Sequence, residues 1–175
     1  GMTGDPLRPL LESAAEGDDV ALARLVRCTQ ADVWRLCSAL GTPGEVEDLV
    51  QETYLRMLRA VPAFRAESSV RTWLLAIARH VCADDVRGRE RRRRLLRRIM
   101  EQPFEIGELP PPDPETLLDS LTPPLREAFV LTQMLGLPYA EAAEILCCPV
   151  GTIRSRVSRA RAELMGVLEA EAQLA

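Results

Sequence analysis

A stretch rich in proline and acidic side chains divides this chain into two parts. Residues 101–114 hold five prolines and four carboxylates, and they show no helical periodicity. Proline has no backbone N–H and a fixed φ, so this composition opposes both helix and sheet. We interpret the segment as part of a flexible linker. The chain then divides into an N-terminal domain over residues 1–98, a linker over 99–121 and a C-terminal domain over 122–175.

Helical periodicity dominates on both sides of this linker. Apolar side chains recur at helical spacing, and the sequence contains neither an alternating β-branched run nor a hairpin dipeptide between apolar segments. Because 47% of the residues are hydrophobic, each part has enough apolar material for a core. We therefore expect an all-α protein made of two small helical domains.

The N-terminal part is expected to form four helices. The apolar pattern predicts them over about residues 10–29, 31–40 and 45–61, and from residue 70 into an arginine-rich stretch. A capping box at residues 42–45 would open the third helix.

The fourth helix follows a break at Pro62, and Ser68 or Ser69 is expected to cap it. Trp73, Ile77 and Val81 have the spacing of a stripe that faces the core. Trp73 has two interpretations, a core anchor or a platform for base stacking, and its spacing favours the core.

The C-terminal part has the spacing of a helix-turn-helix. A helical run over residues 125–135 stops at Gly136, a short run covers 139–146, and residues 147–149 turn the chain into a third helix. This is the arrangement of a helix-turn-helix with one extra supporting helix. A DNA-reading helix needs such a scaffold packed across it.

The third helix, which starts at residue 150, combines an apolar stripe with a basic face. The stripe consists of Ile153, Val157, Ala160 and Leu164. The other face and its flanks carry small polar and basic side chains: Gly151, Thr152, Arg154, Ser155, Arg156, Ser158, Arg159 and Arg161. Small polar residues let a helix approach base edges, and guanidinium groups reach phosphates or guanine. An ordinary solvated amphipathic helix is the alternative, but the supporting helices favour DNA binding.

Charge is distributed unevenly along the chain. The net charge is −4, and all 22 basic residues are arginine. Residues 101–124 hold six acids and no arginine, whereas residues 87–98, the arginine cluster, hold eight arginines and one glutamate. Local basic segments of this kind bind nucleic acid even when the whole chain is acidic.

Several function classes find no support. The five cysteines and the single histidine, His80, show no zinc-ligand spacing, so we expect no metal or cofactor and free thiols that are buried or half-buried. No apolar run approaches the roughly 18 residues of a membrane span, and no signal-peptide pattern is present. A soluble cytoplasmic protein is expected. With no phosphate loop and no nucleophile–base set, we do not expect an enzyme.

The outer face of the predicted 45–61 helix is acidic. It presents Glu45, Asp48, Gln51, Glu52, Leu55 and Arg59. Such a face could receive a basic helix from a partner protein, and a solvated charged face is the simpler explanation from these residues alone.

Three motifs resemble one known family. They are DLVQETYLR at residues 48–56, FRAESSVRTWLLAIARH at 64–80 and CPVGTIRSR at 148–156. Together, and in this order around an acidic linker, they are similar to the bacterial extracytoplasmic-function sigma factors of the sigma-70 family. Within that family the chain looks most like the actinobacterial sigma factor C type.

The resemblance implies a function in transcription initiation. The sigma factor would bind core RNA polymerase at the β′ clamp helices and the β flap, recognise promoter DNA and melt it, and an anti-sigma factor could regulate it. The polymerase-binding residues implied are Asp48, Gln51, Glu52 and Leu55. The implied −10 element residues are Phe64, Arg65, Ser68, Ser69, Arg71, Trp73, Arg79, His80 and Arg87, with the arginine cluster holding nearby phosphates. The implied −35 element residues are Thr152, Arg154, Ser155, Arg156, Ser158 and Arg159.

Two positions depart from the family pattern. Ser158 replaces a residue that can be aromatic in relatives, and Cys147 stands where the turn commonly has glycine. If the backbone there has positive φ, Cys147 carries roughly 1 kcal/mol of strain. A redox role for Cys147 is the less favoured interpretation, because a buried turn residue needs no chemistry.

Two other functions remain open at this point. A stand-alone helix-turn-helix regulator explains the C-terminal part but leaves the acidic face and residues 64–80 without a task. A sigma-like decoy that acts through protein contacts alone is opposed by the cationic recognition face.

Overall fold

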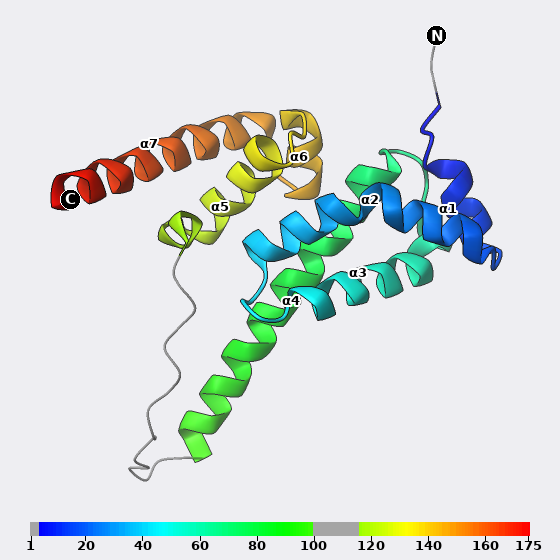
Figure 1. The fold of residues 1–175 in the computed structure, drawn as a ribbon, viewed down its shortest axis with the longest axis horizontal. Coiled ribbons are helices and arrows are strands. Elements are labelled where there is room, and N and C mark those ends of the chain that lie inside the picture. The colour runs from blue at the N-terminus through cyan, green and yellow to red at the C-terminus, as the bar shows by residue number, and fades with distance from the viewer. Residues whose placement is uncertain (1–3, 100–115) are drawn as a thin grey trace.

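The computed structural model describes residues 4–99 and 116–175, and every regular element in them is a helix (Figure 1). The N-terminal part contains α1 (Arg8–Ala15), α2 (Asp19–Leu40), α3 (Val46–Ala60), the short 3-10 turn η1 (Val61–Ala63) and α4 (Val70–Ile99). The C-terminal part contains η2 (Leu117–Ser120), α5 (Pro123–Phe129), the π-helical turn η3 (Val130–Met134), α6 (Tyr139–Ile145) and α7 (Val150–Leu174). The expected all-α fold is confirmed. Most of the expected linker, residues 100–115, lies outside the described residues.

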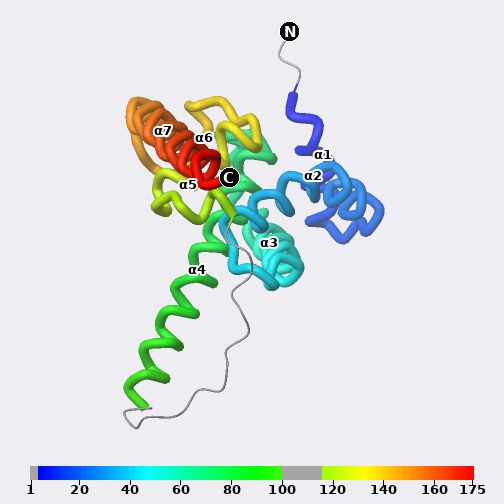
Figure 2. Tube along the Cα trace, turned by 60° about the vertical axis from the view of Figure 1, so that its left-hand side comes forward, coloured from blue at the N-terminus to red at the C-terminus, as the bar shows by residue number. Residues whose placement is uncertain are grey.

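The N-terminal core forms where α2 and α3 pack on the first half of α4. The second half of α4 extends away from this core, so that both sides of the helix are open to solvent (Figure 2). The side chains buried in this core include Leu25, Leu36, Met57, Leu74 and Leu75. The core therefore fixes the start of α4 and leaves its end exposed.

The first helix boundary differs from the expected one. The sequence pattern predicted a break near residue 30, whereas the structure places it at Gly17, which has φ of 97°. The carboxylate of Asp18 accepts hydrogen bonds from the amides of Val20 (3.0 Å) and Ala21 (3.1 Å) and so caps α2. No glycine or proline lies near residue 30, so α2 continues through that point.

The capping box expected at residues 42–45 does not form. Glu45 occupies the N-cap position of α3 but makes no side-chain cap bond. The Thr42 hydroxyl instead donates to Asp85 of α4 at 2.6 Å, and Gly44 turns the chain with φ of 82°. A tertiary contact with α4 has replaced the local cap.

The buried face of α4 is wider than the expected stripe. Val81 is buried, but Trp73 and Ile77 are only half-buried. The core positions on this helix are Val70, Leu74, Leu75, Ala78, Val81 and Cys82. The difference arises because α4 packs against α2, α3 and also α6, which together cover more than one stripe.

The expectation that the thiols are buried or half-buried is wrong for two of the five. Cys28 and Cys147 are exposed, Cys148 is half-buried, and Cys37 and Cys82 are fully buried. Cys37 and Cys82 lie against each other between α2 and α4. Their hydrogen bond lowers the pKa of the Cys37 thiol and, together with burial, raises the pKa of the Cys82 thiol.

The C-terminal part is held together by α7, which packs on both α5 and α6. Leu121, Leu125 and Ala160 form a small separate cluster, and Arg126 donates to the carbonyls of Leu118 and Leu121, both at 2.9 Å. Gly136 ends the first helical run with φ of 68°, as the sequence predicted. The supporting helix α5 is thus bonded to the η2 segment before it and packs on the recognition helix α7.

Candidate nucleic-acid and polymerase interfaces

The turn between α6 and α7 has the geometry of a Schellman cap. The amide of Cys147 donates to the carbonyl of Glu144 (3.2 Å), and the amide of Cys148 donates to the carbonyl of Ala143 (3.1 Å). Cys147 has φ of 50°, the left-handed conformation that normally favours glycine. The positive φ suspected from the sequence is confirmed, although Cys147 is exposed rather than buried.

The recognition helix α7 has the two faces that its sequence predicts. Ile153, Val157 and Ala160 are buried, and Leu164 is half-buried. The candidate −35 residues lie on the outward side: Arg154, Ser155, Ser158 and Arg159 are exposed, and Thr152 and Arg156 are half-buried. This outward surface has cationic and small polar side chains and no carboxylate before Glu163. It can therefore approach a polyanion without like-charge repulsion.

Arg156 and Arg161 lie on the flanks of this outward surface. Arg156 Nη1 lies 3.9 Å from Cys148 Sγ, which directs the guanidinium toward the turn. Arg161 donates to Gln133 of η3. The two flanking cations are thus partly held by the helix-turn-helix itself.

The acidic face of α3 surrounds an open hollow. Asp48, Gln51 and Leu55 are exposed, with Leu55 at 49%, while Glu52 is half-buried. The hollow has a volume of about 410 Å³ and is lined by α3 and α4, with five carboxylates among its residues: Glu45, Asp48, Glu52, Asp84 and Asp85. An exposed leucine beside carboxylates suits a basic, amphipathic partner helix.

Arg56 organises the carboxylates at this hollow. It contacts Glu52 at 2.8 Å and Asp84 at 2.7 Å, and these hydrogen bonds raise the pKa of Arg56. Arg56 and Arg87 together lower the pKa of the Asp84 carboxyl, so that it stays ionised. The remaining carboxylate oxygens keep a negative field at the surface.

The loop before α4 lines a small cavity that is partly open to solvent. Its lining consists of residues 63–68 together with Trp73, and its volume is about 160 Å³. The rings of Phe64 and Trp73 lie 4.9 Å apart at 50°, and Ala66 has φ of 57°. Ser69 caps α4, because its hydroxyl accepts from the amide of Thr72 at 3.1 Å. Of the two candidate caps, Ser69 is therefore the one used.

The other candidate −10 residues lie in the loop before α4 or along α4, and they differ in exposure. Arg65, His80 and Arg87 are exposed, with His80 Nδ1 lying 2.8 Å from the carbonyl of Ala76 and Arg87 paired with Asp84. Ser68 is half-buried, and so are Arg71 and Arg79.

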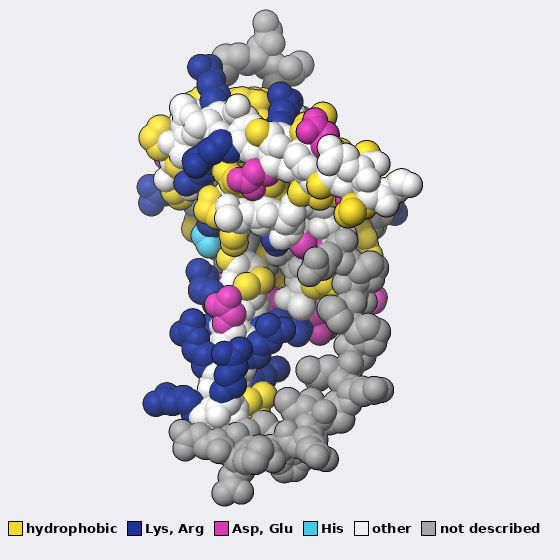
Figure 3. All heavy atoms as spheres, turned by 90° about the vertical axis from the view of Figure 1, so that its left-hand side faces the viewer, with side chains coloured by type: hydrophobic (Ala, Val, Ile, Leu, Met, Phe, Trp, Pro, Cys, Tyr) yellow, Lys and Arg dark blue, Asp and Glu magenta, His cyan; other side chains and the backbone are white. Residues whose placement is uncertain are grey.

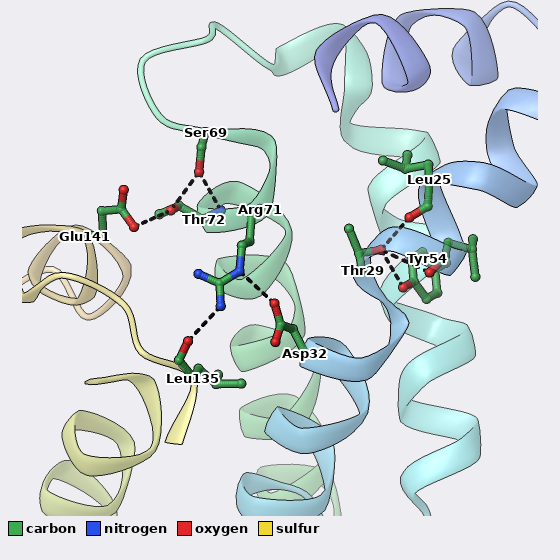
Figure 4. Close-up of polar contacts among 10 residues, drawn as sticks. Leu25, Thr29, Asp32, Tyr54, Ser69, Arg71, Thr72, Leu135 and Glu141 are labelled. Carbon is green, nitrogen blue, oxygen red and sulfur yellow. Dashed lines mark hydrogen bonds and ion pairs between the residues drawn. The ribbon is translucent and has the colours of Figure 1, made fainter. Parts of the chain in front are cut away.

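Side chains of α4 are engaged by the C-terminal part (Figure 4). Arg71 donates to Asp32 of α2 and to the carbonyl of Leu135, both at 2.7 Å. The Thr72 hydroxyl donates to Glu141 of α6 at 3.1 Å. Arg79 lies 3.1 Å from Glu127 of α5. The face of α4 that carries Arg71 and Arg79 is therefore covered in this arrangement.

The arginine cluster occupies the exposed end of α4. Basic side chains follow the helix on the face shown in Figure 3. Arg87 and Arg89 pair with neighbouring carboxylates. In the described part of the chain, no carboxylate lies within salt-bridge distance of the other cations: Arg91, Arg92, Arg93, Arg94, Arg97 and Arg98. Six cations on one helix, with no carboxylate of the described residues beside them, give this surface a strongly positive potential.

Two family models match this chain. The model for Sigma-70 region 2 matches residues 25–92, and the model for Sigma-70, region 4 matches residues 115–164. The ECF RNA polymerase sigma factor SigC of Mycobacterium tuberculosis is 47% identical over 163 residues, which cover 90% of this chain and 88% of the relative. The chain belongs to the extracytoplasmic-function sigma factors of the sigma-70 family. As a sigma factor, it binds core RNA polymerase and directs it to promoter DNA to initiate transcription.

Two solved sigma factors have the same fold. CnrH, solved in complex with the cytosolic domain of CnrY, matches with a TM-score of 0.71 and 29% identity over 93% of this chain and 97% of that one. The sigma factor RpoE, solved with the anti-sigma factor NepR from Bartonella quintana, matches with a TM-score of 0.68 and 30% identity over 84% and 95% of the two chains. Both halves of the sigma factor are covered, which favours this function over a stand-alone regulator.

The region 2 match covers most of α2, all of α3 and most of α4, and the region 4 match covers η2 to the middle of α7. Neither α1 nor residues 93–99 lie within a matched segment.

The acidic partners of α4 were not predicted from the sequence. They are Asp32, Glu127 and Glu141. These lie 39 to 69 positions from the residues they contact, and no local pattern marks them.

Proposed function

We propose that this sigma factor divides promoter recognition between its two halves. The boundaries proposed are an N-terminal domain over residues 1–98, a linker over 99–121 and a C-terminal domain over 122–175. The observation that carries the proposal is the outward surface of α7, which is exposed, cationic and free of carboxylates over residues 150–161. A regulator that acted through protein contacts alone would have no use for such a surface.

The C-terminal domain reads the −35 element as duplex DNA. Residues near the start of a recognition helix enter the major groove, so Arg154, Ser155 and Ser158 contact bases, with Thr152 beside them. Arg156 and Arg159 contact the phosphate backbone and set the register.

The N-terminal domain captures an unpaired base of the −10 element. Unstacking a base costs a few kcal/mol, which contacts in the bound state must offset. The cavity beside Phe64 and Trp73, of about 160 Å³, suits one flat base in size and aromatic lining. Arg65, Ser68 and Ser69 border it or lie next to it. Arg71, Arg79, His80 and Arg87 supply cationic and polar contacts along α4, and the arginine cluster holds phosphates near the melted region.

The α3 face binds core polymerase. Asp48, Gln51, Glu52 and Leu55 present the charge and the apolar anchor that fit the β′ clamp helices, and the C-terminal domain contacts the β flap. The contacts of Arg71 with Leu135 and of Arg79 with Glu127 must separate before α4 can reach DNA.

The cell compartment and regulation follow from this function. We propose that the chain works in the cytoplasm with polymerase and has no catalytic activity of its own. No helix in residues 4–99 or 116–175 is long and apolar enough to cross a membrane. Because CnrH and RpoE were solved with CnrY and NepR, we also propose that a partner of the anti-sigma type binds this chain.

Reconstitution with core RNA polymerase tests the proposal. The purified chain is expected to form a stable complex with core enzyme and to direct specific runoff transcripts from genomic templates. The double substitution Asp48→Asn and Glu52→Gln should weaken the complex. The control substitution Glu12→Gln and Glu16→Gln, in α1 and at its C-cap, removes the same charge and should not weaken it. If no complex forms, or if no template gives a specific transcript, the proposed function is wrong.

A further inference from the structure

Asp5 connects the start of the chain to the start of α4. One carboxylate oxygen, Oδ1, accepts from the amide of Leu7 at 3.1 Å, just before α1. The other oxygen, Oδ2, accepts from the amide of Val70 at 2.6 Å, across 65 positions of sequence. A single side chain thus holds two helix beginnings together.

The α4 helix consequently has a cap in two parts. The Ser69 hydroxyl satisfies the amide of Thr72, and Asp5 satisfies the amide of Val70, the first residue of the helix. Free amides at a helix start carry partial positive charge, so a carboxylate there is more favourable than a neutral acceptor. Asp5 therefore contributes both a hydrogen bond and a favourable charge at the point where the loop becomes helix.

The loop before this cap is held at its start by Phe64, which packs against Trp73 and the core. It separates two hollows: the cavity beside Trp73, and a second one of about 500 Å³ that the N-terminal segment and α1 border from the other side. The second hollow is lined by Gly4, Asp5, Arg8, Pro9, Glu12, Phe64, Ala66 and Ser68. Ala66 has φ of 57°, a conformation that an L-residue adopts only when its surroundings impose it. At the far end of this loop, Asp5 is the contact that comes from another part of the chain, beside the local cap by Ser69.

Nothing in the family match assigns a role to Asp5, because the region 2 match begins at residue 25. We propose that Asp5 is a positioning residue for −10 recognition. It holds the end of the loop and the first turn of α4 in the geometry that a captured base requires. This inference rests on the proposed function of the loop. It extends the −10 site to the N-terminal segment, which touches no DNA in this account.

The chain offers a matched control in Asp18. Asp18 is also an aspartate that caps a helix in the same domain, with two backbone amides as donors, but it caps α2. It does not border either hollow beside the loop. Replacing either aspartate removes a helix cap, so a general loss of stability should appear in both variants.

Hydrogen exchange of the free protein gives the first readout. In Asp5→Ala, amides of residues 64–72 are expected to exchange about fivefold faster, the order of effect of losing a helix cap. In Asp18→Ala they should exchange at the wild-type rate. Equal exchange of this segment in wild type and Asp5→Ala would overturn the proposal.

Base discrimination in the reconstituted holoenzyme gives the second readout. Changing the captured base of the −10 element lowers wild-type initiation by some factor, and this factor should be about fivefold smaller for Asp5→Ala. Asp5→Asn, which keeps an acceptor, should lie between the two. The penalty for a −35 change should be the same in all variants, and Asp18→Ala should keep both wild-type penalties.

The two readouts separate the inference from the function beneath it. If the wild-type holoenzyme initiates and discriminates but Asp5→Ala has the wild-type penalty at the −10 base, the role of Asp5 is wrong. A wild-type holoenzyme that fails to initiate contradicts the proposed function instead, and hydrogen exchange still decides whether Asp5 anchors the loop.

Discussion

Arg154 and Arg159 are both exposed on α7, but their surroundings differ. Arg154 lies in the first turns, beside Gly151 and Ser155, where small side chains let the helix approach base edges. Arg159 lies further along the helix, where a recognition helix leaves the groove floor and passes phosphates. Two arginines on one helix are therefore expected to contribute in different ways.

Alanine at each position should separate base contact from phosphate contact. Arg154→Ala should relax the preference at one −35 position and weaken specific binding by about 1–3 kcal/mol. Arg159→Ala should weaken binding to all sequences equally and reduce the slope of log Kd against log salt by about 1. Binding of the holoenzyme to a panel of −35 variants at several salt concentrations measures both, and the same uniform loss in both variants would contradict the assignment.

At Cys147, the backbone conformation decides how a substitution changes stability. Its φ of 50° favours glycine, so Cys147→Gly should stabilise the C-terminal half by up to about 1 kcal/mol. Cys147→Ala removes the thiol but keeps the strain, and it is the matched control. Thermal unfolding of the two variants tests this, and a Tm for Cys147→Gly no higher than that of Cys147→Ala would show that the turn is unstrained.

At the scale of elements, α4 performs two tasks along one helix. Its first half belongs to the core of the N-terminal part, and its second half carries the exposed arginine cluster. A helix without packing partners over its last turns is stabilised mainly from the packed end. The cluster thus continues the same helix that begins at the proposed −10 site.

The end of the arginine cluster should contribute sequence-independent affinity. Changing Arg93 and Arg97 to Ala should weaken promoter binding at every sequence and lower the salt slope by up to about 2, one for each phosphate contact. Changing Arg24 and Arg27 on α2 to Ala gives a control with the same loss of charge. An equal effect of both pairs would show that only the overall charge matters.

Much of the element structure could be predicted from the sequence, because apolar periodicity, Gly136 and Ser69 act locally. The helix-turn-helix and the outward surface of α7 follow from such signals. The break at Gly17 was missed, because apolar residues recur at helical spacing on both sides of Gly17 and of the cap residue Asp18. The interaction of Thr42 with Asp85, and the burial of Leu74 in place of Trp73, depend on tertiary packing that local patterns do not record.

At the scale of the whole molecule, the two halves share one buried cluster. Residues of α4 such as Leu75 and residues of α6 such as Ala142 belong to the same core. Arg71, Thr72 and Arg79 add polar contacts at this boundary. Arg71 and Arg79 are also −10 candidates, so the proposed function implies that promoter binding and packing of the halves compete for these side chains.

Removing the ion pair at this boundary should favour the separated arrangement. Glu127→Gln weakens the contact with Arg79, a half-buried pair that contributes about 1 kcal/mol. Energy transfer between dyes on the exposed thiols of Cys28 and Cys147, in a Cys148→Ala background, should fall in this variant. Glu144→Gln, an exposed change on the C-terminal half, is the control, and unchanged transfer in Glu127→Gln would show that the pair does not hold the halves together.

We propose that the two halves read two separate elements of one promoter for RNA polymerase. Runoff transcription by the reconstituted holoenzyme tests it most directly, on a cognate template, on the same template with a scrambled −35 element and on one with a scrambled −10 element. The cognate template should give a specific transcript, and each scrambled template should lose it. On the cognate template, an Arg154→Ala holoenzyme should give a weaker transcript, because it loses one of several −35 contacts. A transcript that survives either change, or that forms with core enzyme alone, would contradict the account.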